Sequence, residues 1–224
     1  SQFITRIEVY NELQYRYEGD YYLNQAVART IVKLGKRFTT RIDVPYVHNT
    51  IGVATSEQQS GIGDVSIRLL GYQLFQKPRS ALTASIELSF NTAESPYLGA
   101  GKNVVIPMVT YSLLMPKQRL LFSGLFQQAN SFHGSESRRD VSFSKLQLIV
   151  LRYWSKRLWT LLAPEFYYDY IGTGLSMNMR ARMTHAPSPR INVWITPSVG
   201  VFGDFFARYT WSVDVGGRFF LLRR

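Results

Sequence analysis

The residues that could carry chemistry are few, and their types exclude most catalytic and metal sites. The chain has no Cys and only three His, at positions 48, 133 and 185. The absence of Cys excludes disulfide scaffolds, thiolate metal sites and cysteine catalysis. A metal site would need His or carboxylate side chains paired at close spacing, and no such pair surrounds the three His. We therefore expect no metal, no cofactor and no catalytic residue.

Other polar pairs also fall short of a catalytic arrangement. Glu165 and Asp169 are four residues apart, which on a strand separates them by roughly 13 Å, too far to share a proton. A Ser–His pair on a strand face, or a His at an outer rim beside acids, would be needed for a barrel enzyme. The second arrangement could be drawn for His48 with Glu57 only by assuming a loop fold. We expect that the protein is not an enzyme.

The elements that must position the polar side chains alternate with a period of two. Residues 82–91 read Leu-Thr-Ala-Ser-Ile-Glu-Leu-Ser-Phe-Asn, and residues 175–184 alternate in the same way. A helix would spread these apolar residues around its circumference, whereas a strand collects them on one face. The strands are roughly ten to fourteen residues long, against about five or six in soluble proteins and about nine to eleven for a strand that crosses a bilayer.

About twelve such segments follow one another, with no linker or second domain between them. They cover residues 3–17, 21–34, 37–47, 63–75, 80–91, 103–114, 119–129, 141–154, 158–170, 175–186, 191–202 and 205–221. Every second connector is short and basic, and the intervening ones, including 48–62, 92–102 and 130–140, are longer and rich in Gly, Ser and Asn. This asymmetry is typical of outer-membrane barrels. We predict an all-β fold, a transmembrane antiparallel up-and-down β-barrel of about 12 strands that forms a single domain over residues 1–224.

The composition agrees with this fold. Hydrophobic residues make up 46% of the chain and the mean hydropathy is −0.10, and no apolar run is long enough for a transmembrane helix. The 14 Tyr, 14 Phe and 4 Trp exclude a disordered chain. Pro107, Pro164 and Pro197 fall inside predicted strands, where each requires a bulge or a locally unpaired position.

Alternation alone leaves open which face points inward. An inward apolar face would give a soluble lipocalin-like barrel, and an outward one a membrane barrel with a polar lumen. Charges of both signs on the polar face favour the membrane barrel, because they can pair across a hydrated lumen. The pore-lining residues that we predict are Arg41, Asp43, Arg68, Glu87, Glu165, Arg180, Arg182, Asp214 and Arg218.

Aromatic residues gather near the strand ends, as two interfacial girdles would require. The long-loop end carries Tyr15, Tyr17, Tyr46, Phe90, Tyr168 and Tyr170, and the short-turn end carries Phe38, Trp154, Trp159 and Phe219. Ordinary sheet packing is the alternative, because strands favour aromatic residues in any protein.

The last strand carries a further signal. Asp214, Gly216, Phe219 and Leu221 fit a polar-x-Gly-x-x-aromatic-x-hydrophobic pattern, which resembles the terminal signal read by the outer-membrane barrel assembly machinery. Residues 222–224 follow it, whereas such chains commonly stop at the aromatic residue. The chain starts at Ser1 without a signal peptide, so we expect a processed, mature form.

Residues 61–64, Gly-Ile-Gly-Asp, lead into a predicted strand and follow residues 41–46, Arg-Ile-Asp-Val-Pro-Tyr. They lack the Lys and the helix of a phosphate-binding loop. This layout resembles the outer-membrane family named for the meta-pathway of phenol degradation, and Pro107 and Pro197 are placed comparably. The resemblance covers the layout of most of the chain, and the tetrapeptide is its one compact motif. It implies a small porin-like transporter barrel of 12 strands for small molecules, hydrophobic ones included.

The net charge of +11, from 26 Lys and Arg against 15 Asp and Glu, divides into two populations. Predicted inward positions are nearly balanced, and most of the surplus lies in the short turns and in the pairs Arg138-Arg139 and Arg223-Arg224. We expect these cations to meet outer-membrane lipids and lipopolysaccharide, an acidic periplasmic or envelope protein partner, or only solvent. Nucleic acid is not expected, since Arg and aromatic residues interleave only because strands alternate.

These observations predict a narrow channel for small solutes in the bacterial outer membrane, with both termini periplasmic and a weak anion preference set by the lumen arginines. A second interpretation is a non-conducting anchor of an envelope complex that binds partners through its long loops or basic turns. A third is a soluble ligand-binding barrel.

Overall fold

The computed structural model describes residues 4–17, 21–51, 57–95, 97–172, 174–204 and 209–221. These residues form thirteen strands, and among them no helix is long and apolar enough to cross a membrane. The strands are β1 (Arg6–Arg16), β2 (Tyr21–Lys33), β3 (Phe38–Ile51), β4 (Glu57–Ile62), β5 (Ser66–Gln76), β6 (Ser80–Ser89), β7 (Lys102–Met115), β8 (Leu120–Gly134), β9 (Ser142–Tyr153), β10 (Leu158–Asp169), β11 (Gly174–Ser188), β12 (Ile191–Phe202) and β13 (Trp211–Phe220).

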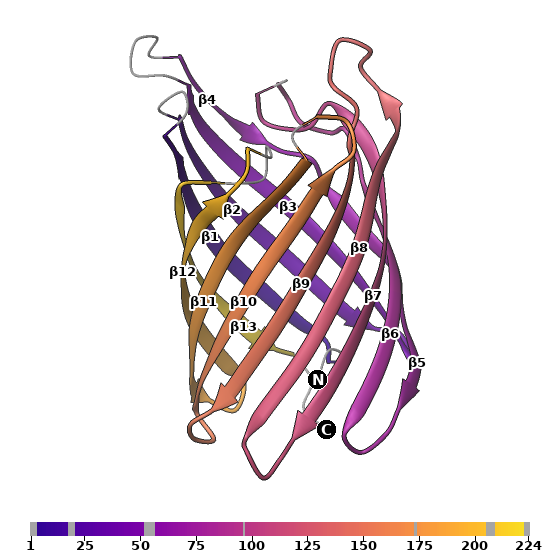
Figure 1. The fold of residues 1–224 in the computed structure, drawn as a ribbon, viewed down its shortest axis with the longest axis vertical. Helices are drawn as coiled ribbons and strands as arrows, with labels where there is room; N and C mark the ends of the chain where they lie inside the picture. The colour runs from indigo at the N-terminus through magenta and orange to yellow at the C-terminus, as the bar shows by residue number, and fades with distance from the viewer. Residues whose placement is uncertain are drawn as a thin grey trace.

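Twelve of these strands close into an antiparallel ring (Figure 1). Apart from β4 and β5, which both pair with β3, each strand pairs with its neighbours in the sequence, β1 pairs with β13, and the pairing of β2 with β3 completes the circle. The upper part of β3 pairs with β4 and its lower part with β5, so β4 and β5 are two halves of one interrupted strand. The predicted antiparallel barrel of about 12 strands is confirmed.

Two predicted loops prove to be partly strand. The predicted loop 48–62 contains the end of β3 and all of β4, and β8 extends to Gly134, inside the predicted loop 130–140. These extensions are rich in polar residues, such as Gln58 and Gln59, so hydrophobic alternation gives no sign of them. Of the predicted last strand, residues 205–208 lie outside the described residues.

The connections between strands differ in length at the two ends of the barrel. Figure 1 shows the start of β1, the end of β13 and the tight turns at one end and the longer connections at the other. Backbone hydrogen bonds close the tight turns, with Lys77 N–H donating to Ser80 C=O at 2.8 Å and Trp154 N–H donating to Leu158 C=O at 3.0 Å. Gly35, between β2 and β3, has a φ of 99°, a conformation that side chains disfavour.

Burial in the barrel wall is inverted relative to that in a soluble domain. Glu165 and Asp214 are 2% exposed and Asn178 is 1% exposed, whereas Val109 and Leu148 are 44% and 43% exposed. An apolar outer face on a closed sheet suits hydrocarbon, and buried charges suit a polar lumen. The apolar face therefore points outward, and the soluble lipocalin-like alternative is excluded.

The aromatic residues predicted for the girdles are exposed or half-buried, and Tyr168 packs against Tyr170 with a ring-centroid distance of 5.0 Å. Trp159 departs from the prediction of an outward girdle position. It lies in register with Thr184, which is 5% exposed, and its ring packs near that of Tyr153 at 6.2 Å. Strand parity therefore places Trp159 on the lumen face.

Pro107, Pro164 and Pro197 each keep the pairing with one neighbouring strand. On the other side, the ladder skips the Pro and the residue before it in all three cases. Because Pro has no N–H to donate, the gap falls where a ladder bond could not form. The prediction of locally unpaired positions is confirmed.

We predict that Val109→Arg destabilises the barrel by about 2–4 kcal/mol, because it places a charge on the outward face near the middle of β7. Tyr168→Arg, near the end of β10, should cost only about 0–1 kcal/mol. Denaturant unfolding in lipid vesicles measures both free energies. Equal costs at the two positions would contradict the lipid-facing assignment.

Candidate functional site

The nine predicted pore-lining residues lie on inward strand positions, and all take part in ion pairs. The carboxylates are nearly buried, with exposures of 8% for Asp43, 9% for Glu87 and 2% for both Glu165 and Asp214. The five arginine side chains are 14–27% exposed: Arg41, Arg68, Arg180, Arg182 and Arg218. The charged residues form two networks along the lumen wall.

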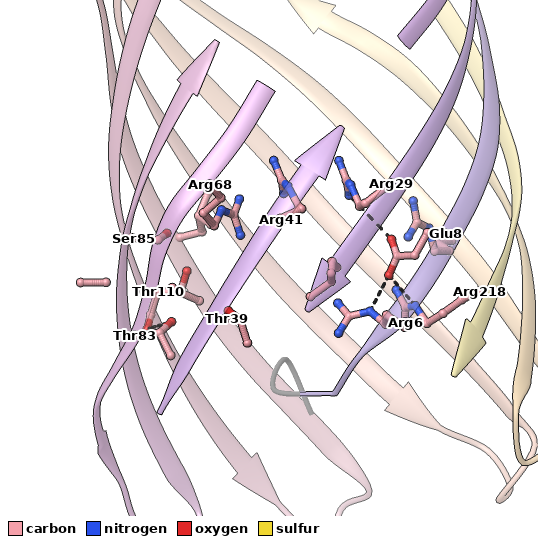
Figure 2. Close-up of a pocket in the computed structure, with 15 residues that line it drawn as sticks. Arg6, Glu8, Arg29, Thr39, Arg41, Arg68, Thr83, Ser85, Thr110 and Arg218 are labelled. Carbon is pink, nitrogen blue, oxygen red and sulfur yellow. Dashed lines mark hydrogen bonds and ion pairs between the residues drawn. The ribbon is translucent and has the colours of Figure 1, made fainter. Parts of the chain in front are cut away.

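The first network starts at Glu8 on β1 (Figure 2). Its Oε1 accepts hydrogen bonds from Arg6 Nε at 2.7 Å and Arg218 Nε at 2.6 Å, and its Oε2 lies 3.7 Å from Arg29 Nη1. Arg29 also donates from Nε and Nη2 to the two oxygens of Asp43, both at 2.8 Å. One chain of charges thus joins the last strand to the first three.

The first network continues from Asp43 to the β5–β6 wall. Arg41 Nη2 lies 3.2 Å from Asp43 Oδ2 and also donates to Glu87 Oε2. Arg68 Nη2 donates to the same Glu87 oxygen at 3.1 Å, so two guanidinium groups share one acceptor. The Nε atoms of Arg41 and Arg68 are buried without a hydrogen-bond partner among the described residues.

The second network centres on Arg180. Its guanidinium lies 3.5 Å from Glu12, 3.9 Å from Glu165 and 3.6 Å from Asp214, which come from three different strands. Arg182 Nη2 donates to Asp214 Oδ2 at 2.7 Å. The guanidinium of Arg180 therefore serves as a common counter-ion for three carboxylates.

Glu165 and Asp214 have further partners that the sequence does not reveal. Lys145 Nζ, Gln147 Nε2 and Tyr167 Oη donate to Glu165 at 3.0, 2.8 and 3.0 Å. Trp194 Nε1 donates to Asp214 at 3.0 Å. Polar and apolar residues alternate poorly in the segment that holds Lys145. Its side chain is assigned to the lumen by the β9–β10 register, in which Lys145 lies opposite the buried Tyr167.

The Gly-Ile-Gly-Asp tetrapeptide anchors a loop. The Asp64 carboxylate accepts hydrogen bonds from the N–H groups of Ala93 at 3.2 Å and Ala100 at 2.6 Å. A Cβ on Gly63 would lie 2.9 Å from Val47 and 3.0 Å from the Leu98 carbonyl, so the close approach requires glycine. The motif holds residues 90–101 against the β3–β5 wall.

A Ser–His contact lies on the β3–β4 pair, where the sequence shows only a loop. His48 Nδ1 is 2.6 Å from Ser60 Oγ, directly across the ladder. Among the described residues this is the one hydrogen bond that orients the ring, so the pair lacks the third member of a catalytic triad. The same residues contain no group of three or more His, Asp or Glu that could hold a metal ion.

No protein-family model matches the chain, and no curated protein matches it in sequence. Among solved structures, an outer membrane channel from Pseudomonas putida F1 aligns with a TM-score of 0.76 at 13% identity, covering 96% of this chain and 95% of that chain. The NanC porin aligns with a TM-score of 0.70 at 11% identity, covering 96% and 100%. The translocator domain of the autotransporter NalP from Neisseria meningitidis reaches 0.51 at 11% identity, covering 96% and 86%.

At these identities the likeness is one of fold. The chain shares the closed β-barrel architecture of that outer membrane channel and of that porin.

We predict that Glu87→Gln destabilises the barrel by about 2 kcal/mol, between the values for exposed and buried ion pairs. The change leaves Arg41 and Arg68 side by side without their shared carboxylate. Glu136→Gln, in an exposed loop, should have no measurable effect. Unfolding temperatures from heat-modifiable gel migration compare the two, and equal temperatures would show that the shared carboxylate contributes nothing.

At the long-loop end, Lys102 Nζ binds Asp140 at 2.8 Å, and this hydrogen bond, with a second from Ser131, lowers the pKa of the Asp140 carboxyl. A lowered pKa means that the contact stabilises the loop above the ordinary carboxyl pKa of about 3.9 and is lost as the pH falls through the lowered value. We expect the hydrogen-exchange protection factors of residues 135–141, which are corrected for the intrinsic exchange rate at each pH, to fall at acid pH. Asp140→Asn should remove this pH dependence, and an unchanged pH profile in that variant would contradict the assignment.

Proposed function

We propose that the chain is a single-domain, narrow channel for small solutes in the bacterial outer membrane. The observation that carries the proposal is the inverted burial, in which a closed apolar-faced ring surrounds a lumen of fixed charges. The likeness in fold to an outer membrane channel and to a porin supports it. A ring of this size lies between barrels of about eight strands, which side chains fill, and open porins of about sixteen.

The arrangement of the lumen charges supports a weak anion preference. Every lumen carboxylate described above is engaged by at least one Arg or Lys, so a passing cation meets compensated acids. Arg41 and Arg68 share a single oxygen of Glu87 and their side chains are 14% and 25% exposed, so a passing anion meets guanidinium groups that are only partly compensated.

The two ends of the barrel supply the proposed lipid and protein contacts. Lys77, Lys117 and Lys156 are exposed in the tight turns at the end where β1 starts and β13 ends. We propose that they face anionic headgroups or an acidic periplasmic or envelope protein, and that the long-loop end faces lipopolysaccharide. The Arg223-Arg224 pair lies outside the described residues.

The terminal pattern is proposed to serve the barrel assembly machinery. Phe219 and Leu221 support this, because they are 45% and 54% exposed on the outward side. Gly216 also has a local reason, since a Cβ there would lie 2.5 Å from both Trp194 and Tyr10.

Planar-bilayer recordings test the channel. We expect unitary conductance steps with a slight preference for chloride over potassium. Arg180→Glu should shift the selectivity toward cations, because it removes the counter-ion that three carboxylates share. Arg157→Glu changes the charge equally in an exposed turn and should leave selectivity unchanged.

A folded protein that gives no steps would contradict the channel. That result would favour the anchor of an envelope complex, whose partner would bind the long loops or the basic turns.

A further inference from the structure

A cavity of about 200 Å³ lies inside the lumen between the β1–β3 wall and the β5–β7 wall. Its charged lining is six arginines and one carboxylate: Arg6, Arg29, Arg41, Arg68, Arg182, Arg218 and Glu8. Hydroxyl groups from neighbouring strands complete it, with Thr83, Ser85 and Thr110 gathered on the side of Arg68 in Figure 2. Ten of the fifteen lining residues therefore carry side-chain hydrogen-bond donors, and six of these ten are positively charged.

The positive charge around this cavity exceeds the negative charge. Arg182 pairs with Asp214, which belongs to the second network. Among the described residues, the other five arginines form ion pairs with three carboxylates, Glu8, Asp43 and Glu87, so positive charge exceeds negative charge by two in this part of the lumen. Pairs of arginines share single carboxylate oxygens. Arg6 and Arg218 both bind Oε1 of Glu8. Arg41 and Arg68 both bind Oε2 of Glu87.

Hydrogen-bond donors are also in surplus. Arg68 binds Glu87 through Nη2, while its Nε is buried with no partner among the described residues, and the same holds for Arg41 Nε. These Nε atoms are closed to a ligand, but both side chains line the cavity and are exposed, Arg41 by 14% and Arg68 by 25%, so the accessible part of each guanidinium favours a ligand that supplies oxygen acceptors. The planar fork of Arg matches the oxygens of carboxylates and phosphates, and Thr and Ser hydroxyls can donate to the remaining ones.

We propose that this cavity is a binding site for a compact oxyanion of charge −2, either phosphate or a small dicarboxylate. A dianion balances both surplus charges, whereas a monoanion balances one and a neutral solute leaves the donors without acceptors. The biological role of this site rests on the proposed channel function, because the site would then lie on the path of the solute through the lumen. Binding itself does not require conduction.

Titration calorimetry on the folded protein in detergent at low ionic strength tests the site, with inorganic phosphate, succinate and chloride as separate probes. We expect saturable binding of at least one dianion, and chloride binding at least tenfold weaker. Binding of phosphate alone or of succinate alone would identify the ligand within the class. No saturable binding of either dianion would overturn the proposal.

Variants place the binding in the cavity. Arg68→Gln should weaken dianion binding about tenfold, equivalent to about 1.4 kcal/mol. Arg157→Gln removes the same charge from an exposed turn and should leave the affinity unchanged. Thr83→Asp keeps every arginine and should also weaken binding, because its carboxylate takes up part of the surplus charge. Equal affinity in folded Arg68→Gln or in folded Thr83→Asp would overturn the site.

Conductance of the same preparation in potassium chloride separates this proposal from the channel function. Conduction without dianion binding would overturn the site and leave the channel. Dianion binding that Arg68→Gln weakens, in a protein that never conducts, would overturn the channel and leave the site.

Discussion

Hydrocarbon offers no hydrogen-bond partner to a backbone N–H or C=O group. In the closed ring of this barrel, these groups are instead hydrogen-bonded between neighbouring strands. The pairing of β2 with β3 and of β1 with β13 closes the ring, and among the described strands only β4, at the long-loop end, pairs along one side alone. Once the ring is closed, each strand residue faces either lipid or lumen, so a period-two sequence is sorted into two environments. The exposed Val109 and the buried Glu165 are two results of the same closure. Even the strand prolines conform, because each lies where the ladder with one neighbour is interrupted.

The ion-pair networks take the place that a hydrophobic core has in a soluble protein. Arg180 contacts carboxylates from β1, β10 and β13, and Glu8 contacts arginines from β1, β2 and β13. Arg180 and Glu8 thus each have several charged partners on different strands, so the loss of either leaves several others uncompensated. The same sharing produces the uneven distribution of charge along the lumen wall. Around the second network carboxylates surround Arg180, and around the cavity arginines outnumber their carboxylates.

Much of this barrel could be predicted from the sequence because strand periodicity and side-chain polarity report directly on the two faces. Which residues meet across the lumen could not, because register and barrel curvature decide it. Arg182 contacts Asp214 rather than Glu165, and Lys145 joins the lumen from a segment with weak alternation. The β3–β4 hairpin was hidden because its residues are polar, and the function of Asp64 as a loop anchor depends on Ala93 and Ala100, about thirty residues away. Trp159 shows that an aromatic residue near a strand end does not face lipid by default.

The ion pair between Glu8 and Arg218 joins residues that are 210 positions apart in the chain, and Ser212 binds Glu12 across a separation of 200. In the β1–β13 register Glu8 lies opposite Arg218, so a slip of one residue would turn Glu8 toward lipid and a slip of two would set it opposite Gly216 or Phe220. The carboxylates of the first strand therefore gain some of their partners only when the last strand is in place, Arg218 for Glu8 and Ser212 for Glu12. In an incomplete or misaligned barrel, Glu8 and Arg218 would not form their ion pair where β1 meets β13. This ion pair therefore favours the complete barrel in its correct register over the alternatives.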